Sequence, residues 1–171
     1  MSQPQVSIII VNYNGLGVIV DCLTSIFGHL PAPAIEVIVV DNDSQDGSPE
    51  LIAQKFPQVN LLRQSKNGGF GTANNVGARQ ARGEYLLLLN SDTLVTADIL
   101  PVLVAKLTSE AHVGIVGPRL LNPDGSFQLS IAHEIGLWGE WRTLQQVKQY
   151  RIPANRPALA ARYDRDQVVD I

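Results

Sequence analysis

The sequence predicts an α/β fold in which a mostly parallel sheet carries helices on both faces. Three short, continuously apolar runs, SIIIV, VIVV and LLLL, alternate with segments whose apolar residues recur at helical spacing. Strands that alternate with helices need crossover connections, and these connections produce parallel strand pairs. Strands without alternating polar positions fit a sheet that is covered on both sides. The 171 residues suffice for one domain with its own core.

The first half of the chain contains two strand–helix pairs. Val6–Val11 is rich in β-branched residues and too short for a helix, so we expect a buried strand. Leu16–Leu30 follows with helical spacing of its apolar residues. Ile35–Val40 predicts a second buried strand, and Ser48–Phe56 predicts a short helix.

A third and a fourth strand follow. Val59–Leu62 is a shorter and weaker apolar run, which we interpret as a strand. Gly69–Ala81 is rich in alanine and asparagine, and we expect it to be helical from about Thr72. Tyr85–Leu89 predicts the fourth strand because it is short, apolar and bounded by polar residues.

The pattern becomes less regular toward the end of the chain. Ala97–Leu107 predicts a helix with a cap at Thr96, and Val113–Val116 predicts a fifth strand. NPDG at Asn122–Gly125 is a strong turn signal between apolar stretches, so a hairpin is expected there. Residues 132–171 lose clear periodicity and predict an irregular or helical tail.

The final letters of the sequence, VVDI, resemble the beginning of a strand, where a domain seldom stops. We therefore expect a chain that is cut short. The predicted division is a core of residues 1–131 and the truncated start of a further region at residues 132–171.

Composition excludes some classes of function. A net charge of −3, without a long run of Lys or Arg, argues against a nucleic-acid partner. The single cysteine, Cys22, allows no internal disulfide and predicts a reducing compartment. No apolar run approaches the length that crosses a bilayer, and the N-terminus lacks the pattern of a signal peptide. We expect a cytoplasmic protein, with attachment to the inner face of the membrane left open.

Polar segments follow four of the predicted strands. They are Asn12–Gly15, Asp41–Ser48, Ser65–Gly71 and Asn90–Thr93. The carboxyl ends of parallel strands meet at one edge of the sheet, and ligands of open α/β sheets bind outside that edge. This coincidence predicts a ligand site.

The single residues of these segments allow more than one interpretation. Asp41 directly ends a buried strand, so its carboxylate must find donors such as those of a nucleobase or a ribose. For Asp43 and Asp46, a role in the turn or as a helix cap is as good an interpretation as a role in the ligand site. The KNGGFG loop fits a backbone anion nest, but it matches neither the dinucleotide fingerprint nor the P-loop.

Asn90, Ser91 and Asp92 end the most apolar strand. A carboxylate beside an amide oxygen can hold one hard divalent cation, because Mg²⁺ commonly takes one or two carboxylates together with substrate phosphates and waters. The alternative is that Asp92 only stabilises a turn.

Three motifs occur in the order SIIIVNYNG, VIVVDNDSQDGS and KNGGFGTANNVGARQARGEYLLLLNSDT. In this order they resemble the family 2 glycosyltransferases with the Rossmann-like GT-A fold, over about residues 6–130. VGIVGPRLLNPDGSFQLS further resembles the rhamnosyltransferase-like branch. The resemblance implies inverting, metal-assisted transfer of a sugar from a dTDP- or UDP-sugar to an acceptor hydroxyl in cell-surface polysaccharide synthesis.

The resemblance also implies the residues of the site and the partners. A divalent cation, Mg²⁺ or Mn²⁺, would be held by Asp92 and Asn90. The nucleotide-diphosphate sugar would be bound by ten further residues: Val11, Asn12, Tyr13, Asp41, Asp43, Lys66, Asn67, Gly69, Asn75 and Ser91. The acceptor would be a saccharide or a lipid-linked molecule. Peripheral membrane association of the full-length protein and self-association are compatible with this assignment.

Two features depart from the family pattern. Asn42 and Asn90 stand where many members carry acidic residues, although asparagine is common at both positions in the rhamnosyltransferase-like branch. The general base of inverting members lies in an ED-type motif, and residues 132–171 contain none, with Glu134 and Glu140 placed too early to match it. We therefore expect a donor-binding half that lacks its catalytic base.

Two other functions are compatible with parts of the sequence. A sugar-phosphate nucleotidyltransferase would carry a basic, glycine-rich loop after its first strand, and NYNG has no Lys or Arg. A non-catalytic nucleotide-sugar-binding module is consistent with the missing base. The presence of both Asp41 and Asp92 argues against such a module.

Overall fold

The computed structural model describes residues 3–31, 34–109, 111–130 and 137–162. The chain divides into two compact units, residues 1–115 and 116–171, and each is described by itself. This division follows the contacts between residues and says nothing about donor or acceptor binding, so the functional division at residue 131 stays a prediction.

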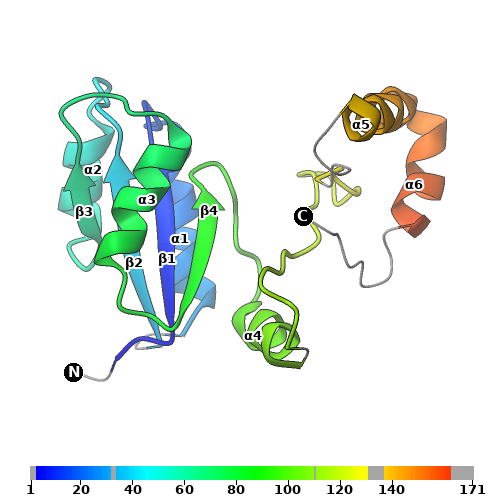
Figure 1. The fold of residues 1–171 in the computed structure, drawn as a ribbon. Helices are drawn as coiled ribbons and strands as arrows, with labels where there is room; N and C mark the ends of the chain where they lie inside the picture. Colours follow the sequence, from blue (N-terminus) through cyan, green and yellow to red (C-terminus); the bar gives the residue numbers. More distant parts are fainter. Residues whose placement is uncertain (1–2, 32–33, 110, 131–136, 163–171) are drawn as a thin grey trace. The chain divides into compact units, whose positions relative to one another are not determined.

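The first unit is built on a four-stranded parallel sheet, which confirms the predicted fold class (Figure 1). The spatial order is β3-β2-β1-β4. The strands are β1 (Val6–Asn12), β2 (Ile35–Asp41), β3 (Asn60–Arg63) and β4 (Tyr85–Asn90). Because Asn12 pairs with Asp41 and Val11 pairs with Asn90, three strands end at nearly the same level.

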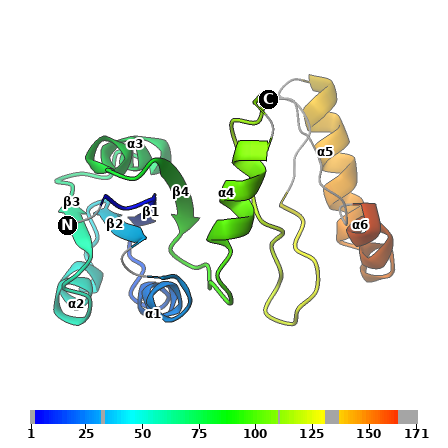
Figure 2. The ribbon, with the colours of Figure 1, turned by 90° about the horizontal axis from the view of Figure 1, so that it is seen from below.

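Helices connect these strands and cover both faces of the sheet (Figure 2). Helices α1 and α2 lie on one face, and α3 lies on the other. The helices of the first unit are α1 (Ile19–His29), α2 (Ser48–Lys55), α3 (Phe70–Gln80) and α4 (Leu100–Ser109).

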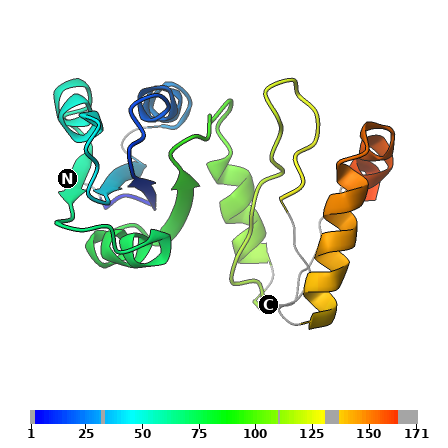
Figure 3. The ribbon, with the colours of Figure 1, turned by 90° about the horizontal axis from the view of Figure 1, so that it is seen from above.

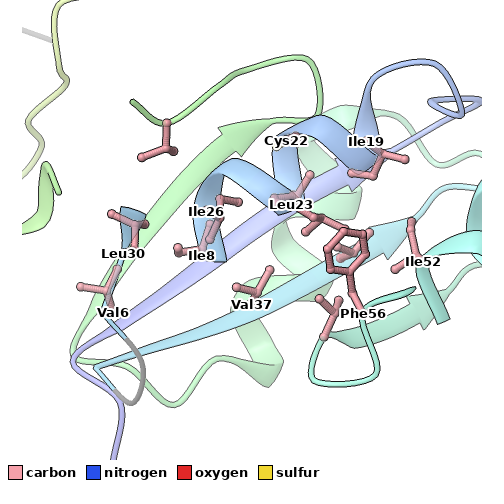
Figure 4. Packing of buried hydrophobic residues seen from close by; sticks show 14 of the residues in the cluster. Val6, Ile8, Ile19, Cys22, Leu23, Ile26, Leu30, Val37, Ile52 and Phe56 are labelled. Carbon is pink, nitrogen blue, oxygen red and sulfur yellow. The ribbon is translucent and has the colours of Figure 1, made fainter. Parts of the chain in front are cut away.

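The larger part of the core lies between the sheet and helices α1 and α2 (Figure 4). Its fully buried members include Ile8 of β1, Val39 of β2 and Leu23 of α1. A smaller cluster on the other face joins Val11, Ile38 and Val40 to Ala73 of α3. Removing these side chains from water is the main contribution to the stability of the fold, and it holds the strand ends in place.

Two predictions for the region after β4 need correction. Helix α4 begins at Leu100 rather than at residue 97. Asp98, and not Thr96, serves its first turn, because the Leu100 N–H donates to Asp98 Oδ1 at 3.2 Å. The predicted fifth strand at Val113–Val116 is wrong, since these residues form no strand in the described part of the chain. A β-branched run satisfies strand propensity, but a strand also needs a partner edge, which local sequence does not specify.

The second unit contains the predicted turn and short helices. Leu121 and Phe127 form an antiparallel bridge around the NPDG turn, and Gly125 adopts a φ of 78°, which glycine tolerates. The helices are α5 (Leu137–Tyr150), the 3₁₀ helix η1 (Pro153–Asn155) and α6 (Arg156–Arg162). Tyr150 of α5 donates its hydroxyl to the Phe127 carbonyl at 2.7 Å, which joins the helix to the turn.

Two sequence features lie outside the described residues, the VVDI end and Glu134. Among the helices that the structure describes, none has both the length and the apolar character needed to cross a membrane.

Candidate functional site

The carboxyl edge of the sheet gathers the polar segments that the sequence singled out. Figure 3 views the sheet from this edge. Asn12 of β1 lies beside Asp41 of β2, and Asn90 of β4 lies on the other side of β1. The structure therefore brings the ends of three different strands to one place.

Asn12 and Asp41 form the centre of a buried hydrogen-bond network. The Asn12 side chain is fully buried, and Asp41 is 3% exposed. Asn12 Nδ2 donates to Asp41 Oδ1 at 2.8 Å and to Ser48 Oγ at 2.8 Å, and it lies 3.2 Å from Ser44 Oγ. The other Asp41 oxygen, Oδ2, accepts the Ser44 N–H at 3.1 Å. Both oxygens of this carboxylate therefore have donors from the protein.

Asp46 continues the network toward the loop after β1. Asp46 Oδ1 accepts the Ser48 hydroxyl at 2.6 Å and the Ser48 N–H at 3.0 Å, and Oδ2 accepts the Leu16 N–H at 2.8 Å. Desolvation opposes ionisation of this carboxyl, but these hydrogen bonds outweigh it and lower the pKa of Asp46. Asp46 is therefore an ionised structural link between α2 and the first loop.

Asn14 ties the same two loops together. Its N–H donates to Ser44 Oγ at 2.9 Å, and its side-chain Oδ1 accepts the Gln45 N–H at 2.9 Å. Asn14 and Asp43 adopt positive φ values of 50° and 71°, a conformation in which asparagine and aspartate are enriched among residues with a side chain. The asparagine and aspartate content of these loops is therefore partly a requirement of their geometry.

Asn42 connects the β2 end to the loop before α3. Its Nδ2 donates to Asn67 Oδ1 at 2.8 Å, and its Oδ1 accepts the Gly68 N–H at 3.0 Å. Asn67 Oδ1 also accepts the Gly69 N–H at 2.9 Å. Gly69 has a φ of 84° and immediately precedes α3, so the glycine fits the turn that begins the helix.

The remaining predicted nucleotide-binding residues differ in exposure. Val11 and Asn12 are buried, whereas Tyr13 is 53% exposed. Asp43 and Ser91 are half-buried. The loop and α3 residues are exposed, namely Lys66, Asn67, Gly69 and Asn75. Side-chain hydrogen bonds join Asn12 to Asp41, and a separate pair joins Asn67 to Asn42. Tyr13, Lys66 and Asn75 are placed by their backbone segments.

The predicted metal ligands lie at the end of β4. Asn90 and Asp92 are both exposed, and the Thr93 N–H donates to the Asn90 carbonyl at 3.2 Å to close a turn. The same carbonyl is 3.7 Å from the Cys22 Sγ of α1. Burial, with the nearby Asp92 charge adding to it, raises the pKa of the Cys22 thiol to about 12. The end of β4 therefore lies against the first turn of α1.

The oxygen atoms of Asp92 and Asn90 fit one hard cation whose coordination is completed by a bound ligand. Within the part of the chain that the structure describes, no group of three His, Cys, Asp or Glu side chains converges on one point. A carboxylate with a neighbouring amide is a sparse set, which suits Mg²⁺ or Mn²⁺ when phosphate oxygens and waters supply the other positions.

Five residues whose side chains make these hydrogen bonds were not among the predicted site residues: Asn14, Asn42, Ser44, Asp46 and Ser48. Each stands inside a motif that was singled out, so its position was available. What the sequence lacked was a sign that these side chains join separate loops.

The family described as "Glycosyl transferase family 2" matches residues 7–166 of the chain. The succinoglycan biosynthesis protein ExoO of Rhizobium meliloti (strain 1021) is 34% identical over 124 residues, which cover 71% of this chain and 35% of that protein. The N-acetylglucosaminyl-diphospho-decaprenol L-rhamnosyltransferase of Mycobacterium tuberculosis (strain CDC 1551 / Oshkosh) is 30% identical over 103 residues, which cover 54% of this chain and 34% of that protein.

A solved structure shares the fold. The mannosyltransferase PcManGT from Pyrobaculum calidifontis, in complex with GDP-Man and Mn²⁺, superposes with a TM-score of 0.61 at 28% identity. The match covers 72% of this chain and 37% of that one. The chain thus spans about a third of the length of these proteins.

Proposed function

The chain belongs to glycosyl transferase family 2, and on that premise we propose that its sheet edge binds the nucleotide of a nucleotide-diphosphate sugar. The observation that carries the proposal is the Asn12–Asp41 pair at the level ends of β1 and β2, with Asp92 following the end of β4. These strand ends bring two carboxylates to one edge of the sheet, and we assign one to the base and the other to a metal–diphosphate group.

Asp41 is the proposed contact to the base. A carboxylate accepts a hydrogen bond from the ring N–H of uracil, thymine or guanine, and each of its oxygens keeps a free lone pair beside its protein donor. A dTDP- or UDP-sugar remains the proposed donor, because the rhamnosyltransferase-like resemblance motivates it. The GDP-Man of the Pyrobaculum enzyme makes GDP a necessary comparison.

Asp92 and Asn90 are the proposed ligands of the cation, with Ser91 beside them. The bound cation supplies neutralisation of the departing diphosphate. This arrangement lets a chain with a net charge of −3 bind an anionic donor. Lys66 and Asn75, on the loop before α3 and on α3 itself, are exposed and available to the phosphates and the ribose.

The proposed reaction of the whole protein is inverting transfer of the sugar to an acceptor hydroxyl during polysaccharide synthesis. The role of ExoO in succinoglycan biosynthesis and the activity of the mycobacterial rhamnosyltransferase support this class of reaction. A base must deprotonate the acceptor hydroxyl as it attacks the anomeric carbon. We assign no residue of this chain as that base, and we propose a saccharide or a lipid-linked molecule as the acceptor.

Calorimetric titration with UDP, dTDP and GDP, with and without Mn²⁺, tests the proposal. We expect one nucleotide to bind in a Mn²⁺-dependent manner, and we expect Asp92→Asn to remove that dependence. Glu84→Gln is the matched control, because Glu84 is an exposed acid at the opposite end of β4. Equal loss of binding in both variants, or no nucleotide binding by the wild type, would refute the proposed site.

A further inference from the structure

We propose that Asn12 is a positioning residue that aims the Asp41 carboxylate at the nucleobase and does not itself touch the donor. The inference rests on the proposed function and gives one of its predicted ligand contacts a different role. It concerns how the base end of the site is built, separately from the metal end.

Burial decides between direct contact and positioning. The Asn12 side chain has no exposed surface, so no ligand reaches it without opening the strand ends. Its Nδ2 is the only side-chain donor to Asp41 among the described residues, and it reaches Asp41 Oδ1 at 2.8 Å. The Ser44 N–H holds Oδ2 at 3.1 Å. One donor on each oxygen fixes the plane of the carboxylate, and a polar atom held in place before binding loses little entropy when the ligand arrives.

The Asn12 amide is itself held from the helix side. It donates to Ser48 Oγ at 2.8 Å, and the Ser48 hydroxyl in turn donates a hydrogen bond to Asp46 Oδ1 at 2.6 Å. Asp46 Oδ2 accepts the Leu16 N–H, which returns the connection to the loop after β1. The chain of hydrogen bonds therefore runs from Asp41 through Asn12 to α2 and back to the β1 loop. We therefore expect a shift of any member to move the Asp41 carboxylate.

Asn12 Oδ1 faces the position where a side chain at Gly15 would lie. Asn12 Oδ1 is buried and accepts no hydrogen bond, which leaves an unsatisfied acceptor of a kind that proteins normally avoid. Rotating the amide by half a turn would point Oδ1 at the Asp41 carboxylate, which is also an acceptor, so the orientation follows from Asp41. A Cβ at position 15 would collide with Asn12 Oδ1. The glycine therefore leaves the space in which the amide can lie against Asp41.

Three substitutions perturb this device in different ways. Asn12→Ala removes every bond of the amide. Gly15→Ala keeps the amide but places a methyl group against its Oδ1, so the amide must shift. Asn12→Asp keeps the shape but sets a second carboxylate against Asp41, so the two groups repel each other unless they share a proton.

Ser7→Ala is the matched control. Ser7 is also fully buried in β1, donates to Glu36 and accepts the Gly83 N–H, but it lies at the opposite end of the strand. Its loss lowers stability without touching the proposed site. Thermal unfolding of every variant, followed by circular dichroism, shows which of them are folded at the temperature of the titrations.

The measurement is the dissociation constant of Mn²⁺ complexes with two probes, inorganic diphosphate and the nucleoside diphosphate that binds the wild type best among UDP, dTDP and GDP. We expect Asn12→Ala to weaken nucleotide binding about tenfold, the effect of misplacing one charge-assisted hydrogen bond, while diphosphate binding stays within about twofold. Gly15→Ala should shift the same ratio in the same direction. Ser7→Ala should leave the ratio unchanged.

The pH dependence separates positioning from general loss of structure. For Asn12→Asp, we expect weak nucleotide binding at about pH 8 and recovery toward wild-type affinity at about pH 5.5, where a shared proton restores the hydrogen bond to Asp41. The charged side chains of the surrounding loops, Asp43, Asp46 and Lys66, are present in both proteins, so the ratio of variant to wild-type affinity cancels their titration.

The outcomes are distinguishable. If the wild type binds none of the three nucleotides, the proposed function fails and this inference fails with it. If the wild type binds a nucleotide and the Asn12 variants lose both probes equally, or keep both, the inference alone is overturned. A pH-independent Asn12→Asp variant would overturn it as well.

Discussion

Cys22 carries a buried thiol whose surroundings keep it protonated and therefore unreactive. Cys22 belongs to α1, and its side chain is fully buried in the core. Its sulfur faces the Asn90 carbonyl at the end of β4. Burial and the adjacent Asp92 charge raise the pKa of the thiol to about 12. Because the thiolate is the reactive species, this residue is a packing group rather than a nucleophile.

We predict that Cys22 reacts with a thiol reagent such as DTNB at about pH 8 only as fast as the protein unfolds. The unfolded thiol ionises near its ordinary pKa of about 8.5, whereas the folded thiol stays protonated to much higher pH. This difference makes the free energy of unfolding fall as pH rises above about 9. Labelling rates with and without urea test the first point. Rapid labelling of the folded protein would contradict the burial.

The sequence predicts the environment of Asp41 better than that of Asn12. Asp41 follows VIVV, where a buried carboxylate requires donors, and Asn12 and Ser44 supply them. Asn12 was predicted to contact the ligand, yet its side chain is fully buried. A polar residue at a strand end can point outward to a ligand or inward to a neighbouring strand. Which way it points depends on the register of the next strand, which is a property of the fold.

At the scale of elements, the amino-terminal edge of the sheet has its own polar junction. Glu36 of β2 accepts the Ser7 hydroxyl at 2.5 Å, the Arg82 N–H at 2.6 Å and the Arg82 Nε at 3.0 Å. Desolvation acts against ionisation, but these donors and the arginine charge outweigh it and lower the pKa of Glu36. Ser7 Oγ accepts the Gly83 N–H at 2.8 Å, so the junction also fixes the turn that leads into β4.

We predict that Glu36→Gln lowers the free energy of unfolding by about 1–2 kcal/mol at neutral pH, because a partly buried carboxylate with several donors is replaced by an amide. The lowered pKa gives stability that is present above about pH 4.3 and is lost as pH falls through the folded-state value. The difference between wild type and variant should therefore shrink in acid. Urea unfolding at several pH values measures it.

Glu50→Gln is the control for that experiment. Glu50 also contacts an arginine, Arg63, at 2.7 Å, but both side chains are largely exposed. Exposed ion pairs contribute little to stability, so this variant should unfold almost like the wild type. An equal effect of the two substitutions would mean that burial is not what makes the Glu36 junction stabilising.

The elements were predictable to different degrees for physical reasons. All four strands agree with the sequence within about a residue, because each is a short apolar run bounded by polar turns. Burial on both faces, which continuous apolar runs predict, holds for β1 and most of β2, whereas alternate residues of β4 are exposed. Helix α3 begins at Phe70, two residues before the expected start, because Gly69 and the Asn42–Gly68 contact set its first turn. The predicted strand at Val113–Val116 had the right composition, but propensity alone does not supply a pairing partner.

In the whole molecule, β4 is one of the two edge strands of the described sheet, and β3 is the other. Leu87 and Leu89 pack against the core on the α1 side, while Leu86 and Leu88 are 50% and 55% exposed. Leu88 pairs with Ile9 of β1, and a Cβ on Gly77 of α3 would meet the Ile9 side chain, so these two leucines are on the α3 face. Helix α3 packs over β1 and β2 and leaves this part of the face open to water.

An apolar face on an edge strand favours association with another chain, since it offers both unburied side chains and unpaired backbone groups. We therefore predict that the 171-residue chain self-associates as its concentration rises, and that Leu88→Lys reduces this association by placing a charge on the open face. Val102→Lys is the control, because Val102 is 71% exposed on α4 and not on the sheet.

Sedimentation velocity over about a hundredfold range of concentration measures the effect. A wild type that stays monomeric throughout, or equal relief by both substitutions, would mean that the β4 face does not drive association. Loss of association in the Leu88 variant alone, with nucleotide binding unchanged, would separate this surface from the carboxyl edge that we assign to the donor.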